Sequence, residues 1–81
     1  MQLTRTEIIK NLGELLEDTV GTRRVLSEEL RLMEDLGLTS VDMLYLIIAT
    51  EETFGIRFEN IGIRDIGTVG AVADYIEAHQ K

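Results

Sequence analysis

The sequence predicts an all-α fold: a small antiparallel helical bundle of three long helices and one short helix, with a long loop between the first two long helices. Apolar residues recur at helical spacing in three stretches, and no run alternates apolar and polar residues convincingly enough for a sheet. Proline, which would interrupt a helix, is absent. At 81 residues the chain is long enough for one domain, so we expect residues 1–81 to form a single domain.

The first helix is expected over residues 5–18. Thr4 and Glu7 have the spacing of a capping box, in which each side chain accepts a hydrogen bond from the other residue's backbone amide. Gly21 follows the helix, after Val20, as an end signal. One apolar stripe follows the helical period and consists of Ile8, Ile9, Leu12, Leu15 and Leu16.

Residues 19–39 are not cleanly periodic, and we interpret them as a long ordered loop. A loop of this length inside a compact domain is uncommon and usually functional. An additional helix over residues 28–34 is an open alternative. The side chains expected to hold the loop in place are Val25, Leu26, Leu30, Met33, Leu36 and Leu38.

The second long helix is expected over residues 40–54, with Ser40 as its N-cap and Gly55 as its stop. A short third helix is expected over residues 59–64, with Ile56, Phe58 and Ile61 facing the core. The last helix is expected to begin near Gly67 or Thr68 and to reach His79. Its buried stripe is Val69, Val72, Ala73 and Ile76.

The second long helix carries apolar side chains on two opposite sides. At about 100° per residue, the core side consists of Met43, Leu44, Leu46, Ile47, Thr50 and Phe54. The opposite side consists of Val41, Tyr45, Ile48 and Glu52, flanked by Asp42 and Glu51. A surface helix needs only one apolar stripe. Either the long loop covers the second side, or this side is a docking surface for another protein with an apolar centre and an acidic rim.

The charge balance excludes some classes of partner. Fifteen acidic residues against eight basic ones give a net charge of −7, whereas a nucleic-acid binder needs a basic footprint. The same charge argues against an anionic membrane surface and favours a basic protein partner. The N-terminal residues contain no apolar run long enough for a signal or membrane span, so we expect a cytoplasmic protein. A monomer is the default expectation.

The inventory of reactive side chains does not favour an enzyme. Cysteine is absent, and the single histidine, His79, has no nucleophile or base partner suggested by the sequence. The acids Glu28, Glu29, Glu34 and Asp35 lack the spacing of a calcium-binding loop, so we expect no metal site.

Ser40 has two readings. A serine at a helix start is usually a plain N-cap. A helix N-terminus also offers free amides and the positive end of the helix dipole, which stabilise a phosphate. An exposed hydroxyl there suits attachment of a phosphodiester-linked group. The pattern alone permits this second reading without establishing it.

The surrounding residues resemble the attachment motif of the acyl carrier protein family. Residues 34–42, Glu-Asp-Leu-Gly-Leu-Thr-Ser-Val-Asp, are similar to the family's Asp-Leu-Gly-x-Asp-Ser-Leu-Asp. The similarity continues without a gap through residues 51–56 and 66–69 to residues 73–76, Ala-Asp-Tyr-Ile. The first helix matches in pattern and length only, so the resemblance covers essentially the whole chain.

The resemblance implies a carrier rather than an enzyme. It implies that a phosphopantetheinyl transferase attaches 4′-phosphopantetheine to Ser40, and that the thiol of this cofactor holds acyl groups as thioesters. It also implies that acyl-loading, condensing and acyl-transfer enzymes dock through basic patches, and that the acyl tail is sheltered between the helices. The residues implied to surround the cofactor or meet these partners are Asp35, Thr39, Val41, Asp42, Tyr45, Ile48, Glu51 and Glu52.

Several positions depart from the family pattern. Thr39 stands where Asp is common, Val41 where Leu is common, and Tyr45 where fatty-acid carriers usually have Glu. Arg57 replaces an often acidic position, and Glu59 a common proline. These changes favour a specialised fatty acid, polyketide or modified-lipid pathway. The alternative from a different class is an unmodified helical adaptor that binds partners through the same helix.

Overall fold

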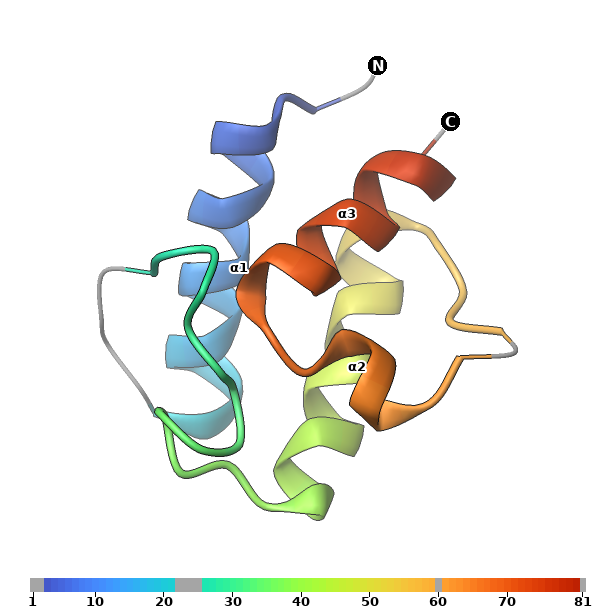
Figure 1. Ribbon diagram of the computed structural model, residues 1–81. Helices are drawn as coiled ribbons and strands as arrows, with labels where there is room; N and C mark the ends of the chain where they lie inside the picture. The colour runs from blue at the N-terminus through green and yellow to red at the C-terminus, as the bar shows by residue number, and fades with distance from the viewer. Residues whose placement is uncertain (1–2, 22–25, 60, 81) are drawn as a thin grey trace.

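The computed structural model describes residues 3–21, 26–59 and 61–80. Three α-helices and one 3-10 helix follow in the order α1 (Arg5–Val20), α2 (Ser40–Phe54), η1 (Ile63–Ile66) and α3 (Val69–His79). Helices α1 and α2 run in opposite directions, α3 crosses obliquely in front of them, and both ends of the chain lie at the same end of the molecule (Figure 1). The predicted all-α bundle of three long helices and one short helix is confirmed.

Helix α1 begins as the sequence predicts. The Thr4 side chain accepts a hydrogen bond from the Glu7 amide, and the Glu7 carboxylate accepts one from the Thr4 amide. The helix runs two residues beyond its predicted end and stops at Gly21, which adopts a left-handed conformation with φ of 72°. Four of the five side chains in its predicted stripe are buried, and Ile9 is partly buried.

The loop between α1 and α2 forms turns rather than a helix over residues 28–34, so the alternative of an additional helix is wrong. Arg31 makes an isolated antiparallel bridge with Thr68, which attaches the loop to the start of α3. Met33 was expected to hold the loop but is 38% exposed, whereas Leu32 is 1% exposed. Leu32 points inward because the bridge sets its direction, a contact that the local sequence does not reveal. Val25 lies outside the described residues.

The short helix lies further along the chain than predicted. It spans Ile63–Ile66 instead of residues 59–64, because the Asp65 carboxylate accepts a hydrogen bond from the Gly62 amide and fixes the start of the turn there. Of the three side chains expected to face the core, Ile56 is buried, and Phe58 and Ile61 are partly buried against the core.

Helix α3 begins after Thr68, whose side chain accepts a hydrogen bond from the Ala71 amide, and ends at His79 as predicted. It packs against α1 and η1. The core is aliphatic and formed by Ile8, Leu12, Leu16, Leu32, Leu38, Met43, Leu46, Ile56, Ile66, Val69, Val72, Ala73 and Ile76. Within the ranges that the structure describes, no helix combines the length and apolarity needed to cross a bilayer.

Candidate functional site

The N-cap of α2 lies one residue earlier than predicted, and a capping box fixes the start of the helix there. The Thr39 hydroxyl accepts a hydrogen bond from the Asp42 amide at 3.2 Å, and the Asp42 carboxylate accepts one from the Thr39 amide at 2.9 Å. Thr39 is therefore the N-cap, and the prediction that Ser40 caps this helix is wrong. The signal was present in the sequence, because an acid stands three residues after Thr39, whereas Met43 stands three residues after Ser40.

Ser40 is the first helical residue of α2 and is exposed. The structure records no hydrogen bond for its hydroxyl within the described residues, because Thr39 and Asp42 perform the capping. The same capping box leaves the backbone N–H groups of Ser40 and Val41 without a recorded partner in this part of the chain. Amides in this position and the positive end of the helix dipole favour a phosphate.

The other side chains expected around Ser40 divide into two groups. Thr39, Val41 and Asp42 share the first turn of α2 with it. Asp35 instead accepts hydrogen bonds from Arg31, at 2.8 Å from the backbone amide and 3.3 Å from the guanidinium. This hydrogen bonding to Asp35 raises the pKa of Arg31 above its usual value.

The outward side of α2 is an apolar surface. Val41, Tyr45 and Ile48 are 58%, 61% and 54% exposed, so the described part of the loop does not cover them. Leu44 is 53% exposed, which corrects its predicted place in the core. Leu44 lies about 100° from Met43 on the helical wheel, at the edge of the core side, where no neighbouring element covers it enough to bury it. We call Val41, Leu44, Tyr45 and Ile48 the α2 apolar face.

The acids beside the α2 apolar face differ in what they contact. The Asp42 carboxylate belongs to the capping box. The Glu51 carboxylate accepts a hydrogen bond from the Phe58 amide at 2.8 Å, which directs it toward the segment that follows α2. Glu52 is exposed and lines a shallow groove of about 280 Å³. The other residues that line this groove are Thr19, Tyr45, Ile48 and Ala49.

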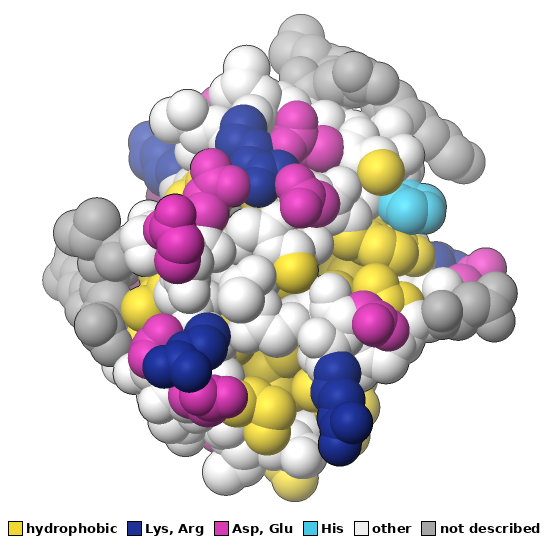
Figure 2. Space-filling model, viewed as in Figure 1, with side chains coloured by type: hydrophobic (Ala, Val, Ile, Leu, Met, Phe, Trp, Pro, Cys, Tyr) yellow, Lys and Arg dark blue, Asp and Glu magenta, His cyan; other side chains and the backbone are white. Residues whose placement is uncertain are grey.

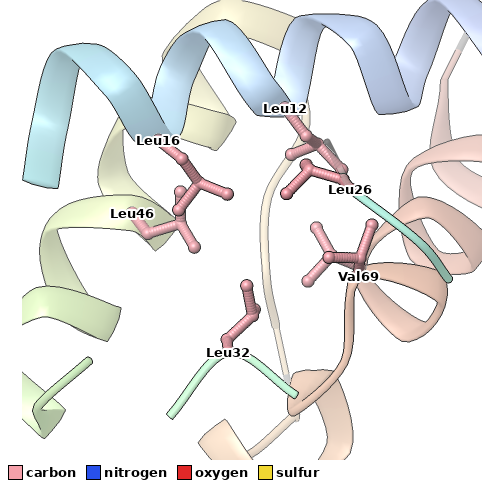
Figure 3. Close-up of a pocket in the computed structure, with 7 residues that line it drawn as sticks. Leu12, Leu16, Leu26, Leu32, Leu46 and Val69 are labelled. Atoms are coloured by element: carbon pink, nitrogen blue, oxygen red, sulfur yellow. The ribbon is translucent and has the colours of Figure 1, made fainter. Parts of the chain in front are cut away.

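A small apolar pocket lies between the three helices and the loop (Figure 3). Its volume is about 10 Å³, roughly the space of a single water molecule. The residues that line it are Leu12, Leu16, Leu26, Leu32, Leu46, Val69 and Val72, and their side chains converge from all four segments. The pocket is therefore lined by side chains that suit an aliphatic ligand, although it is too small to hold an aliphatic chain.

His79 belongs to an aromatic stack rather than to a catalytic group. Its ring lies 3.9 Å from that of Tyr75, which in turn stacks 4.6 Å from Phe58. Its Nδ1 lies 2.9 Å from the Tyr75 carbonyl oxygen. Over residues 3–21, 26–59 and 61–80, no three His, Asp or Glu side chains are grouped to hold a metal ion.

Comparison with known proteins extends this picture. No family model matches the chain. The chain is 31% identical to an acyl carrier protein of Thermotoga maritima over 91% of its own length and 93% of that protein. It is 33% identical to an acyl carrier protein of Acidothermus cellulolyticus, over 94% of the chain and 92% of that protein. It is also 28% identical to the meromycolate extension acyl carrier protein of Mycobacterium leprae, over 95% of the chain and 68% of that protein.

These relatives are named as carriers rather than as enzymes, in agreement with the prediction that the chain is not an enzyme. The similarity extends over nearly the full length of both the chain and the two relatives above 30% identity. The chain belongs to the acyl carrier protein family.

Proposed function

We propose that this chain is a discrete acyl carrier protein and that the Ser40 hydroxyl is the attachment point for 4′-phosphopantetheine. The thiol of this group, when bound, supplies the thioester linkage that holds an acyl chain. The chain itself contains no cysteine, so all thiol chemistry would come from the cofactor. We expect the protein to act in the cytoplasm.

One observation carries this assignment: the hydroxyl of Ser40 is exposed and is not used by the fold. A serine that capped α2 would have its oxygen occupied by a backbone amide. Here Thr39 and Asp42 cap the helix instead, so the Ser40 oxygen is available to a transferase. The residues present fit the group, because Ser40 would hold it and the amides of Ser40 and Val41 favour the adjacent phosphate.

The α2 apolar face is the proposed docking surface for enzymes. The phosphopantetheinyl transferase and the acyl-loading, condensing and acyl-transfer enzymes would cover it and place basic side chains against the neighbouring acids. Glu52 suits this role best, because the carboxylates of Asp42 and Glu51 already accept backbone hydrogen bonds. Charge complementarity of this kind speeds encounter and orients the complex more than it adds affinity.

A specialised pathway for a fatty acid, a polyketide or a modified lipid is the proposed setting. Tyr45 is 61% exposed in the middle of the α2 apolar face, at a position where fatty-acid carriers usually have Glu. An exposed aromatic ring selects a different partner surface from the one a carboxylate selects. The mycobacterial relative, by its name, serves meromycolate extension, which supports a lipid cargo.

Intact mass measurement tests the attachment site. The chain is incubated with coenzyme A, magnesium and a phosphopantetheinyl transferase of broad specificity, and the wild type is expected to gain one phosphopantetheine mass. Ser40→Ala should gain none and should remain folded, because Ser40 does not cap the helix. Ser27→Ala is the matched control, since Ser27 is exposed and is the only other serine in the sequence.

Two results would contradict the proposal. Loading of Ser40→Ala would place the attachment elsewhere. A folded wild type that no transferase loads would favour the adaptor, which would use the α2 apolar face without modification. A pull-down with Tyr45→Ala as the comparison would then identify proteins bound by that face.

A further inference from the structure

The apolar pocket has one wall that is not a helix. Helices α1, α2 and α3 contribute five of its lining residues, and the loop contributes Leu26 and Leu32. At about 10 Å³ the pocket admits no aliphatic chain unless a wall moves. The loop is the wall that can move without unfolding a helix.

Residues 26–32, which we call the strap, are fastened to the start of α3 by backbone hydrogen bonds. The Leu32 amide donates to the Gly67 carbonyl at 2.9 Å, the Val69 amide to the Leu30 carbonyl at 3.0 Å, and the Gly70 amide to the Glu28 carbonyl at 2.9 Å. These three bonds hold Leu26 and Leu32 over the pocket. The strap is thus a separable element with a small number of defined attachments.

The strap approaches α3 closely because residue 70 is glycine. A Cβ atom at Gly70 would lie 3.0 Å from the Glu28 carbonyl oxygen and 3.2 Å from the Glu28 Cβ. Real Cβ contacts are rarely so short. The closed position therefore depends on this small residue at the contact.

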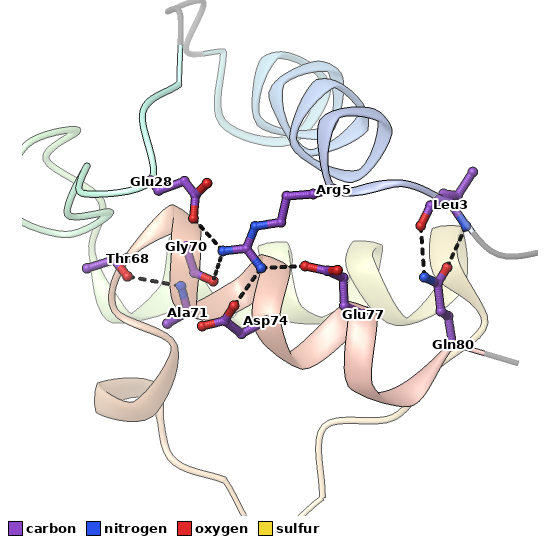
Figure 4. A network of polar contacts seen from close by, with 9 residues as sticks. All are labelled: Leu3, Arg5, Glu28, Thr68, Gly70, Ala71, Asp74, Glu77 and Gln80. Carbon is purple, nitrogen blue, oxygen red and sulfur yellow. Dashed lines mark hydrogen bonds and ion pairs between the residues drawn. The ribbon is translucent and has the colours of Figure 1, made fainter.

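A single guanidinium fixes the strap to both α1 and α3. Arg5 of α1 forms ion pairs with Glu28 of the strap and, at 2.5 Å each, with Asp74 and Glu77 of α3. It also donates to the Gly70 carbonyl at 3.3 Å. Figure 4 shows the guanidinium lying between the strap carboxylate and the two helix carboxylates, and on this face of the molecule several acids surround a basic side chain (Figure 2).

The charge arrangement makes this contact conditional on Arg5. The Glu28, Asp74 and Glu77 carboxylates all bind the same guanidinium, so without it they would be three like charges gathered in a small volume. Loss of Arg5 would then replace attraction between the strap and α3 with repulsion. Loss of Glu28 alone would remove the attraction without leaving that repulsion between the two elements.

We propose that the strap opens to admit an aliphatic chain to the apolar pocket, and that the Arg5 ion-pair cluster is the latch that holds it closed. This inference builds on the proposed function, in which the chain admitted is the acyl tail. It is tested on the unmodified protein, so failure to load Ser40 would not affect it. The latch sets the population of the open form, and that population sets the apparent affinity of the pocket.

Amide hydrogen exchange measured by NMR tests the latch in Arg5→Gln. The amides of Leu32, Val69 and Gly70 fasten the strap and should exchange about fivefold to thirtyfold faster than in wild type, the range expected when a small network of exposed ion pairs is lost. Amides in the middle of α2, such as Leu46, should change much less. Arg64→Gln is the control, because it removes the same charge from an arginine with no ion pair recorded in the described chain.

The double variant Arg5→Gln/Glu28→Gln distinguishes a latch from a general stabilising contact. Removal of the Glu28 charge should relieve the repulsion and slow exchange of the strap amides relative to Arg5→Gln alone. Equal acceleration of strap and α2 amides in Arg5→Gln would overturn the proposal, because the whole fold would then be opening. Unchanged strap amides would overturn it as well.

Titration with decanol tests access to the pocket. Methyl signals of Leu12, Leu16 and Leu46, which belong to the helical walls, should shift on binding. The apparent dissociation constant for Arg5→Gln should fall by the same factor as strap opening rises, because apparent affinity scales with the open fraction. Equal dissociation constants in wild type and Arg5→Gln, despite faster strap exchange, would show that the ligand enters elsewhere and would refute the role of the strap.

Discussion

Gly70 and Gly13 should respond in opposite directions to the same substitution. Both glycines lie in helices, Gly13 in α1 and Gly70 in the first turn of α3. A helical Gly→Ala change by itself gains up to about 1 kcal/mol, because alanine loses less backbone freedom on folding. The two sites differ in what the new methyl group meets.

The methyl group of Gly70→Ala meets the strap, and that of Gly13→Ala meets ordinary packing. At Gly70 the contacts are 3.0 Å and 3.2 Å to Glu28, so the strap must move away or its hydrogen bond to the Gly70 amide must lengthen. Overpacking of this kind costs about 1–3 kcal/mol. Subtracting a helix gain of roughly 0.5–1 kcal/mol leaves a net loss of up to about 2.5 kcal/mol. At Gly13 the nearest atom is Leu26 Cδ1 at 3.8 Å, so the helix gain of roughly 0.5–1 kcal/mol is retained.

Thermal unfolding followed by circular dichroism at a helical wavelength measures both effects. For a domain of this size each kcal/mol corresponds to roughly 4–8 °C in Tm, so Gly70→Ala should melt below wild type and Gly13→Ala a few degrees above it. A Gly70→Ala variant as stable as Gly13→Ala would refute the reasoning, because it would mean that the strap does not rest against Gly70. A destabilised Gly13→Ala would show that the helix gain was misjudged.

Three further predictions concern the caps, the docking acids and the loop after α2. The pKa of Glu7 lies below its usual 4.5, mainly because the Thr4 amide donates a hydrogen bond to the carboxylate. The stability that this bond contributes is fully present above pH 4.5 and is lost as the pH falls through the lowered pKa. Glu7→Gln should therefore flatten the acid side of a pH–stability profile. Charge reversal by Glu52→Lys should slow loading by the transferase with little change in unfolding free energy. Asp42→Lys should slow loading and also cost about 0.5–2 kcal/mol of stability, because Asp42 belongs to the capping box. Equal stability losses in the two variants would contradict this distinction. The Tyr75 hydroxyl donates to the Arg57 carbonyl at 2.6 Å and accepts from the Glu59 amide at 3.3 Å. Tyr75→Phe should therefore cost about 1 kcal/mol of stability and speed amide exchange at Glu59. Unchanged exchange would show that the hydroxyl does not hold this segment.

Local signals made the helices predictable from the sequence. The start of α1 is marked by the capping pair Thr4 and Glu7, and the start of α3 by Thr68 before an apolar stripe. Both signals lie within one or two helical turns of the chain, and both predicted helix starts agree with the structure. The predicted bounds of α2, residues 40–54, agree with the structure, but its N-cap was predicted one residue too late because Thr39 and Ser40 are both good N-caps. The choice between them depends on the partner three residues later, which is Asp42 for Thr39.

Contacts between distant segments were not predictable from the sequence. Arg5 meets Glu28, Asp74 and Glu77 across separations of 23, 69 and 72 residues, and no local pattern marks it as different from the other arginines. The same limit explains Leu32, which is buried because the strap pairs with the start of α3. It also explains the wrong prediction for Leu44. This residue lies at the edge of the core side of α2, so its exposure depends on whether another part of the chain packs beside it.

The capping geometry also changes the meaning of one departure from the family pattern. The family commonly has Asp before the attachment serine, and Thr39 is one of the departures that favour a specialised pathway. Asp and Thr are both preferred N-cap residues, and Thr39 caps α2 with its hydroxyl. The change therefore preserves the feature that keeps the Ser40 hydroxyl out of the fold's own hydrogen bonding. Tyr45 is different in kind, because its ring is 61% exposed, takes no part in capping the helix and is accessible to a partner. Differences in partner choice should thus follow Tyr45→Glu, while Thr39→Asp should leave loading and stability near the wild-type values.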